Sequence, residues 1–532
     1  MTAMRSLILS VAIWSASLGA AEPSADLAKR ALAETATPVR PFLPGGQPAW
    51  NGRAVQFLYA PAFDLPEVSG AVRYRFVLRD SAGREHAFHG LRPSASLAPV
   101  WTEVAVGPAA LTVQGLDAAD KVVGEASVRH LHRAAPFSKP AAEGIDAAGP
   151  ARALATLVHS PDLRCWFGDG QPEPQFVLYR YPSKIVGAAA SALATYAAQQ
   201  PAPADAAEAL AAARRAADYL LGMSFTDEAV WAGHPPTYHP TLYRERLKGH
   251  MSAGNYLTNC GAETGRYLLD VHAATKDRRY LDAALRIAET YEKTQLTEGS
   301  WPLFVNPRDG KPASPNILVP TGVVGFLDQL EAVSGERRFA KVRGRALAWI
   351  MANPVRTWNW QGQFEDVRPL PPYENMTKHE ACDLALYLLG QKERSPEELA
   401  LALEILRYSE DQFVVWAQPP KDTPVSQSAD GAAGGKARKW LLPCVLEQYR
   451  CYAPVCASSA KLIRTYLAAW RATGDRLHLE KAKALGATLA RAQSHVKAPG
   501  RYQTWVMLPP GAMWFNCELM AVRAMQELAA AR

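Results

Sequence analysis

The sequence has few cysteines, and their spacing is not that of a metal site or a redox centre. The seven cysteines include no C-x-x-C pair and no zinc-type spacing, and an Asp-rich calcium loop is also absent. An odd number leaves at least one free thiol. Cys451 and Cys456 are a candidate disulfide in an exported protein, with buried free thiols as the alternative. We therefore expect no metal and no cofactor.

Long basic runs and membrane-length apolar runs are also missing. No cluster of Lys and Arg is interleaved with aromatic residues, and the formal net charge of +7 is small for 532 residues. This argues against nucleic acid as a partner and leaves a mild preference for an acidic substrate. The apolar stretch at residues 6–20 is too short to span a membrane comfortably. We expect neither nucleic-acid binding nor membrane insertion.

The N-terminus does contain the pattern of an export signal. Arg5 supplies a positive charge, residues 6–20 supply a short apolar segment, and small residues at 19–21 supply a cleavage site before Glu22. We therefore assign residues 1–21 as a signal peptide and expect a periplasmic or secreted protein. A retained N-terminal anchor is the alternative.

The chain length predicts two domains, because 532 residues exceed one typical hydrophobic core. Residues 71–80, AVRYRFVLRD, alternate apolar and charged side chains with the period of a half-buried strand. Further short strand-like segments follow, separated by Gly, Asp and Pro. We predict an N-terminal extension over residues 22–49, a small β-sandwich over residues 50–135 and a linker over residues 136–159.

From residue 160 to residue 532 the apolar positions follow a helical period instead. Pairs of helical segments joined by short turns recur at 183–223, 261–295, 321–353, 378–413 and 458–493, and a last helix is predicted over 515–531. An open solenoid could be built from such hairpins. The connections between hairpins are much longer than the turns within them, which favours a closed (α/α)6-type toroid with its long loops on one rim. The predicted fold class is mainly α, with the β-sandwich preceding the toroid.

The long connections are rich in aromatic, acidic and amide side chains. They cover residues 160–182, 226–263, 296–320, 357–380, 438–458 and 501–518. Aromatic planes can cover the apolar faces of sugar rings, while carboxylates, amides and arginines bind the hydroxyl edges, and loops on a rigid scaffold often carry such sites. The alternative is that these rings only pack the hairpins together. We expect an oligo- or polysaccharide as the partner.

The stretch TWNWQGQFEDV, residues 357–367, combines these features within eleven residues. Its adjacent acids, Glu365 and Asp366, point to opposite faces if the chain is extended there. Glycoside hydrolysis needs two carboxyl groups across the scissile bond, and two different loops can supply them. Glu447 lies in another of these loops, so we predict Glu365, Asp366 and Glu447 as catalytic. A helix cap and an ion pair are the structural alternative for the adjacent acids.

Other loop side chains are candidates for binding the sugar or completing the acid pair. Asp162, Glu263, Glu374 and Glu518 are further acids near loop ends. The predicted substrate-binding residues are the aromatic, histidine and asparagine side chains Trp166, His239, Tyr243, His250, Asn255, Asn259, Trp358, Trp360, Tyr373, Tyr449, Trp505, Trp514 and Asn516. A guanidinium suits the carboxylate of a uronic acid, and the loops supply Arg164, Arg180, Arg244, Arg246, Lys248, Arg438 and Lys439.

Three C-terminal segments carry a resemblance to a known family. They are NWQGQFEDV…PPYENMT, LPCVLEQYRCYAPVCASSAKLIRTYLAAWRATGD and WFNCELMA. With the order of export signal, β-domain and toroid, they resemble bacterial exported carbohydrate-active enzymes, closest to glycoside hydrolase family 154, over most of residues 40–532. The resemblance implies exo-β-glucuronidase activity on a glycan that contains uronic acid. The three catalytic candidates come from the loops and not from the resemblance.

Two other classes of function remain open at the level of the sequence. A polysaccharide lyase or a uronate C5-epimerase would need a His or Tyr base and a Tyr acid, for which the second loop offers His239, Tyr243, His250 and Tyr256. A glycan-binding protein without catalysis is the third class. Titratable groups in so many loops favour an enzyme.

Overall fold

The computed structural model describes residues 24–39, 50–54, 56–140, 146–199, 202–242, 254–365, 370–419, 439–449, 451–494, 500–509 and 511–531, with positions 425, 432–433 and 436–437 between them. The predicted signal peptide lies outside this part of the chain, as do Tyr243, His250 and Asp366. Within these ranges, no helix combines the length and the apolar character that crossing a bilayer requires.

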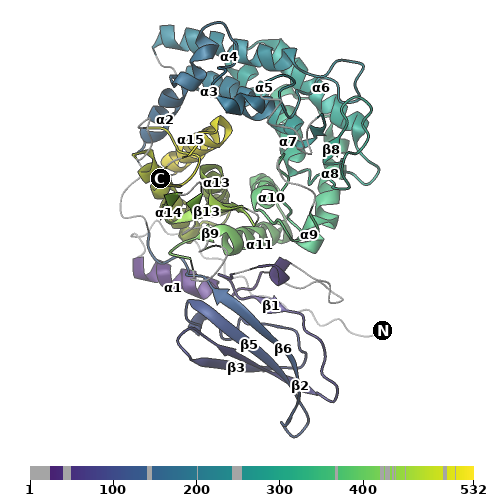
Figure 1. Cartoon of the computed structure of the whole chain (residues 1–532), viewed down its shortest axis with the longest axis vertical. Helices are drawn as coiled ribbons and strands as arrows, with labels where there is room; N and C mark the ends of the chain where they lie inside the picture. The colour runs from purple at the N-terminus through teal and green to yellow at the C-terminus, as the bar shows by residue number, and fades with distance from the viewer. Residues whose placement is uncertain are drawn as a thin grey trace.

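Within the described residues, six helices form an inner ring (Figure 1). They are α3 (Gly187–Ala198), α5 (Asn259–Thr275), α7 (Thr321–Ser334), α10 (His379–Gly390), α13 (Cys456–Thr473) and α15 (Phe515–Ala530). Each helix packs against the next, and α15 packs against α3. The ring is therefore closed, which distinguishes it from an open solenoid and confirms the predicted α/α toroid.

A second layer of helices surrounds this ring. The outer helices α4 (Pro203–Gly222), α6 (Arg278–Thr294), α8 (Ala340–Ala352), α11 (Pro396–Phe413) and α14 (Arg476–Gln493) each pack against the inner helix that precedes them. The helix α2 (Gly149–Val158) packs against α15 and α3. It lies inside the stretch that we predicted as a linker. Its apolar residues are buried against the ring, so part of that stretch belongs to the toroid.

In the short turns within the hairpins, capping residues stabilise the end of one helix or the start of the next. Asp277 and Asp475 each accept a hydrogen bond from a backbone N–H of the following helix. Ser395 and Glu398 form a reciprocal capping box at the start of α11. Gly474 ends α13 at a φ of 72°, in the left-handed region where glycine is unstrained. These caps explain why the hairpin turns are visible in the sequence.

The long connections contain short elements that join neighbouring hairpins. They include the helices α9 (Pro354–Thr357), η3 (Pro161–Phe167), η4 (Val177–Arg180) and the π-helical turn η5 (Pro182–Val186). Small antiparallel sheets link β7 (Tyr256–Leu257) to β8 (Phe304–Val305), β12 (Lys439–Trp440) to β15 (Met507–Leu508), and β10 (Ala432–Ala433) to β11 (Lys436–Ala437). A three-stranded sheet has the order β14 (Cys451–Pro454), β13 (Cys444–Gln448) and β9 (Val414–Val415). These pairings hold the loops that precede the inner helices close to one another.

The N-terminal part of the chain has a different architecture (Figure 1). A four-stranded antiparallel sheet has the order β3 (Glu85–Gly90), β2 (Arg73–Arg79), β5 (Gly107–Leu116) and β6 (Val122–Arg133). A separate pair joins β1 (Ala62–Phe63) to β4 (Ala95–Ser96), and single helical turns η1 (Trp50–Gly52) and η2 (Trp101–Glu103) lie beside them. Strand β2 buries Tyr74, Phe76 and Leu78, as its alternation predicts. A sandwich of two packed sheets is not confirmed.

The N-terminal part packs directly on the outer helices of the toroid. Helix α1 (Ser24–Glu34) lies against α14. At the end of α11, the carboxylate of Asp411 accepts hydrogen bonds from the backbone N–H groups of Leu58 and Tyr59, at 2.6 and 2.7 Å. A single cluster of buried apolar side chains runs from the sheet into the toroid. The two parts therefore share one core.

Candidate active site

A buried ion pair joins two inner-ring segments. The Nζ of Lys184 lies 2.5 Å from the Oε2 of Glu365. Lys184 sits on the π-helical turn η5 that leads into α3, and Glu365 lies in the loop that leads to α10. π-helical turns are rare and are frequent at functional sites. Glu365 is 4% exposed, so the pair brings one of the predicted catalytic acids into the interior beside a cation.

A second carboxylate acts on the same lysine. Burial lowers the pKa of Lys184, but the nearby carboxylates of Glu365 and Glu263 outweigh burial and raise its pKa well above the ordinary value. Glu263 lies in the first turns of α5 and accepts a hydrogen bond from the hydroxyl of Tyr267 at 3.0 Å. Lys184 is therefore positively charged, and it offsets the charge of buried Glu365 and partly exposed Glu263.

The predicted acid Glu447 approaches from strand β13. Its side chain is partly exposed, and its backbone oxygen accepts a hydrogen bond from the Nζ of Lys378 at 2.8 Å. Lys378 is fully buried and also donates to the Oγ of Ser458. Burial lowers the pKa of Lys378 to about 7, while Glu447 opposes this shift. Glu365 is thus accompanied by the partly exposed Lys184, and Glu447 by the buried Lys378.

The thiol of Cys517 lies within electrostatic reach of both acid groups. Burial raises the pKa of Cys517, the carboxylates of Glu447 and Glu263 raise it further, and the ammonium of Lys184 opposes them. The thiol of partly buried Cys517 is therefore affected by charges from α5, from η5 and from β13. The three segments converge where α15 begins, which brings together side chains from distant parts of the sequence.

An aromatic group adjoins this cluster. The ring of Tyr181 lies 5.2 Å from that of Tyr238 and 5.0 Å from that of Trp514, centroid to centroid. The hydroxyl of Tyr238 lies 3.5 Å from the backbone oxygen of Glu365, and Trp514 is partly exposed. The guanidinium of Arg180 stacks on Tyr181, with 4.7 Å from its central carbon to the ring centroid. This arrangement supplies an apolar surface and a cation next to the acids.

Two buried polar atoms near the cluster have no hydrogen-bond partner among the described residues. They are the Oγ of Ser183, which precedes Lys184, and the Oδ1 of Asn516, which precedes Cys517. Helix α15 packs against η5, so both atoms belong to the same region. Buried polar groups are usually paired. An acceptor and a hydroxyl in this position are suited to the hydroxyl groups of a sugar.

Several tryptophans predicted to bind the sugar lie in the core instead. Trp166, Trp358 and Trp360 are each 0–1% exposed and belong to the main hydrophobic cluster. The Nε1 of Trp166 donates to the hydroxyl of Tyr179 at 2.8 Å. These rings have no face open to a ligand, so their role as sugar platforms is not supported. The large apolar area of an indole favours burial between hairpins.

Other predicted binding residues make hydrogen bonds within the protein. The Nδ1 of His239 accepts from the backbone N–H of Leu242, and its Nε2 lies 2.8 Å from the hydroxyl of Tyr219. Buried Tyr373 and Tyr449 donate to the backbone oxygen of Thr357 and to the Oε1 of Gln412. Trp505 is partly exposed where Val455 pairs with it, and Asn255 and Asn259 are partly exposed near the start of α5.

Three of the further candidate acids form ion pairs with arginines. Buried Glu518 accepts two hydrogen bonds from the guanidinium of Arg501, which also lies 3.3 Å from Asp162. Glu374 pairs with Arg53 from the N-terminal part of the chain. Only Glu263 among the further acids lies with Glu365.

The described residues contain no group of three His, Cys, Asp or Glu side chains that could hold a metal ion. All seven cysteines are free thiols.

Sequence reasoning missed the lysines of this cluster. Lys184 is the single charged residue between positions 183 and 200, in a segment that is otherwise apolar or small. A single lysine in an otherwise apolar helical segment was the signal in the sequence that could have identified Lys184 as a site residue. Lys378 carried a weaker one, because it precedes a helix and has His379 and Glu380 beside it.

Comparisons with known proteins give distant structural likenesses. No protein-family model and no curated protein matches the sequence. The fold is similar to a cellobiose 2-epimerase from Spirochaeta thermophila, with 14% identity and a TM-score of 0.49 over 72% of this chain and 98% of that chain. It is also similar to an unsaturated glucuronyl hydrolase specific for heparin, with 10% identity and a TM-score of 0.43 over 72% and 96%. A family 76 glycoside hydrolase from a bovine Bacteroides thetaiotaomicron strain has 9% identity and a TM-score of 0.44 over 87% and 94%. At these values the likenesses carry no argument about activity.

Proposed function

We propose that the protein is an exo-acting glycoside hydrolase that removes a terminal uronic acid from a glycan, in the manner of a β-glucuronidase. The observation that carries this proposal is the convergence of Glu365, Glu447 and Glu263 on the partly buried Lys184–Cys517 region at the start of the inner helices. Hydrolysis of a glycosidic bond needs two carboxyl groups that lie on different sides of that bond. The likeness of the C-terminal segments to glycoside hydrolase family 154 supports the same activity.

The environments of the two predicted acids suit different roles. The Nζ of Lys184 lies 2.5 Å from the Oε2 of Glu365, so Glu365 is our candidate for the base or the nucleophile. Glu447 is partly exposed and comes from another element, so it is our candidate for the acid that protonates the leaving oxygen. Asp366 lies outside the described residues and stays a candidate for the first role.

The uronic acid carboxylate needs a cation that is within reach of a ligand. Arg180 is partly exposed, stacks on Tyr181 and donates to the hydroxyl of that residue at 2.7 Å. Its buried Nε has no partner among the described residues. A guanidinium can hold a carboxylate with two parallel hydrogen bonds. We assign Arg180 to the uronate carboxylate and Trp514 to the apolar face of the sugar ring.

The products of the reaction test the proposed class. The purified protein is incubated with glycans that end in a uronic acid, and released sugar and ultraviolet absorbance are followed together. We expect a saturated uronic acid and no new absorbance. Absorbance that rises with chain cleavage reports the C4–C5 double bond of a lyase, and conversion without cleavage reports an epimerase. Either result contradicts the proposal.

Specific variants test the assigned residues. Glu447→Gln should keep its melting temperature and lose about 10²–10⁴-fold in kcat, the usual contribution of general acid–base catalysis. Glu374→Gln is the matched control, because Glu374 pairs with Arg53 outside the cluster and should leave kcat unchanged. Arg180→Gln should lower kcat/KM for an aryl uronide more than for the matching neutral glycoside. Equal losses on both substrates would remove Arg180 from carboxylate recognition.

No described histidine or tyrosine of the second loop favours the lyase or epimerase alternative. Both ring nitrogens of His239 are engaged, and the hydroxyl of buried Tyr256 lies 2.7 Å from the Nδ1 of His234.

As part of the proposal, the protein is exported and the signal peptide is cleaved before Glu22. N-terminal sequencing of the protein from the periplasm or medium tests the cleavage, and a sequence that begins at Met1 would contradict it.

A further inference from the structure

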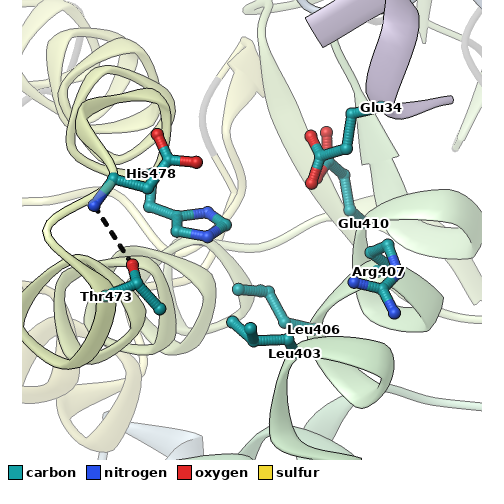
Figure 2. Close-up of a pocket in the computed structure, with 8 residues that line it drawn as sticks. Glu34, Leu403, Leu406, Arg407, Glu410, Thr473 and His478 are labelled. Carbon is teal, nitrogen blue, oxygen red and sulfur yellow. Dashed lines mark hydrogen bonds between the residues drawn. The ribbon is translucent and has the colours of Figure 1, made fainter. Parts of the chain in front are cut away.

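A cavity lies where the N-terminal part meets the outer helices of the toroid, and none of its lining residues belongs to the acid cluster. It has a volume of about 190 Å³ and is lined by Glu34 of α1, by side chains of α11 and by side chains at the start of α14. Figure 2 shows the ring of His478 pointing between Leu403 and Leu406 on one side and Glu34 on the other. A water molecule has a share of roughly 30 Å³ in the liquid, so the cavity has room for several waters or one molecule of monosaccharide size.

The carboxylates of the cavity are already neutralised by partners in the protein. The Nζ of Lys481 lies 2.6 Å from Glu34 and 2.8 Å from Glu410, and Asp475 pairs with Arg30 at 2.5 Å. A carboxylate in an ion pair keeps free lone pairs that can accept further hydrogen bonds. Counted with Arg407, whose charge also acts on Glu34, three cations offset the three acids, so the acids offer acceptors to a ligand without a net negative charge.

Two other groups that line the cavity have unused hydrogen-bonding capacity. Arg407 has no ion pair and no hydrogen bond among the described residues, and its Nε is buried. His478 is 8% exposed, and its Nδ1 is also buried without a partner. Burial lowers the pKa of His478 to about 4, with Lys481 adding to the effect, so this ring is neutral near pH 7. The cavity thus holds one free guanidinium and one neutral imidazole.

From these groups we propose a second ligand site, which takes a small polyhydroxylated carboxylate of monosaccharide size, such as a free sugar acid. The guanidinium of Arg407 would bind the carboxylate of the ligand. Glu34 and Asp475 would accept hydrogen bonds from its hydroxyls, and Leu403 and Leu406 would contact its C–H face. A simple fatty acid would leave the carboxylate acceptors unmatched, and a neutral sugar would leave Arg407 unpaired.

The position of this site couples ligand binding to the packing of the N-terminal helix. Glu34 belongs to α1, whereas Arg407 and His478 belong to α11 and α14 of the toroid. A ligand that contacts all three elements binds the docked arrangement and stabilises it in proportion to the logarithm of its concentration. The proposal does not depend on hydrolysis, because the cavity shares no residue with the Lys184–Glu365 cluster.

Calorimetric titration of the full protein with glucuronate tests the site. The titration is repeated with glucose and with propionate, which lack the carboxylate and the hydroxyls respectively. We expect glucuronate to bind, Arg407→Gln to weaken it at least tenfold, and both comparison ligands to bind at least tenfold more weakly than glucuronate. Leu403→Trp, which fills the cavity and keeps its charges, should weaken binding by a similar factor.

The variant Arg180→Gln separates this site from the proposed active site. Binding that survives Arg180→Gln and is lost in Arg407→Gln supports the cavity, even if no hydrolytic activity is found. Binding that is lost in Arg180→Gln and survives in Arg407→Gln lies at the acid cluster and overturns the proposal. Absence of glucuronate binding to the unaltered protein, or equal affinity for glucose, overturns it as well.

Discussion

The Nζ of Lys184 lies 2.5 Å from the Oε2 of Glu365, although 181 residues separate them in the chain. The pair connects the start of α3 with the loop before α10, which are not neighbours in the ring. Removing one partner of a buried pair leaves an uncompensated charge, which is more costly than removing both. Variants of this pair can therefore test the proposed catalytic role of Glu365 separately from its contribution to stability.

Glu365→Gln should therefore change both activity and stability. We expect kcat to fall by about 10²–10⁴-fold, and the free energy of unfolding to fall by about 3–5 kcal/mol because Lys184 loses its nearest partner. The double variant with Lys184→Met should recover much of the stability and none of the activity. Urea unfolding and steady-state kinetics of the two single variants and the double variant complete a double-mutant cycle. A folded Glu365→Gln protein with the original kcat would show that the pair is only structural.

Glu380→Gln should make stability less dependent on pH. Glu380 is buried on α10 near Lys461, Asp383 and Lys378, and burial raises its pKa to about 7. The unfolded chain loses this proton near pH 4 and the folded protein near pH 7, so ionisation of Glu380 lowers stability as the pH rises across that window. Glutamine cannot ionise. The free energy of unfolding of the variant, relative to that of the unaltered protein, should rise by on the order of 3 kcal/mol between pH 4 and pH 8. Urea unfolding at both pH values measures this difference. The same difference at pH 4 and at pH 8 would contradict the raised pKa of Glu380.

Lys481→Met should loosen the junction between the N-terminal part and the toroid. The side chain of Lys481 is 1% exposed and binds Glu34 of α1 and Glu410 of α11, so its loss removes the ion-pair partner of buried Glu410 and of partly exposed Glu34. We expect the free energy of unfolding to fall by about 3–5 kcal/mol. Lys483→Met on the same helix is the control, because its more exposed pair with Glu480 should contribute less than about 1 kcal/mol. Similar losses in both variants would contradict a special role for Lys481.

Gly265→Ala should disturb the contact between inner helices α5 and α7. A Cβ at residue 265 would lie 2.2 Å from the ring of Phe326, so one of the helices must shift. We expect a loss of about 1–3 kcal/mol from overpacking. Gly344→Ala on the outer helix α8 meets no atom within 4 Å and should stabilise by about 0.5–1 kcal/mol. Thermal unfolding of the two variants compares them directly, and a gain in both would contradict tight packing at residue 265.

The hairpins of the toroid were predictable because their signals are local. The caps at Asp277, Ser395 and Asp475 and the left-handed Gly474 mark turns that the sequence alone reveals. Helix α2 was missed because it is short and follows a stretch rich in Pro, Ala and Gly. The alternation in strand β2 was read correctly, but the number of sheets in the N-terminal part depends on long-range pairing that periodicity does not encode.

The candidate site was only partly predictable. Glu365 and Glu447 could be named as candidates because acids in aromatic loops are unusual, but the lysines that accompany them lie on segments that the periodic pattern assigned to helices. The same loop chemistry misled at Trp358 and Trp360, since an indole beside amides can be a ligand surface or a core residue. Burial decides between these roles, and it depends on how distant hairpins pack.

The closed ring imposes an order on how the chain can reach its native state. The guanidinium of Arg523 on α15 donates to the Oγ of Ser191 on α3 at 2.8 Å, across a sequence separation of 332 residues. The surface of α3 that packs against α15 therefore stays exposed until α15 has been synthesised. Contacts between such distant segments form slowly, and the exposed apolar flanks favour aggregation in the meantime. Loss of α15 would deprive α3 and α13 each of one of their two neighbours in the inner ring, so expression of this protein should depend strongly on an intact C-terminal helix.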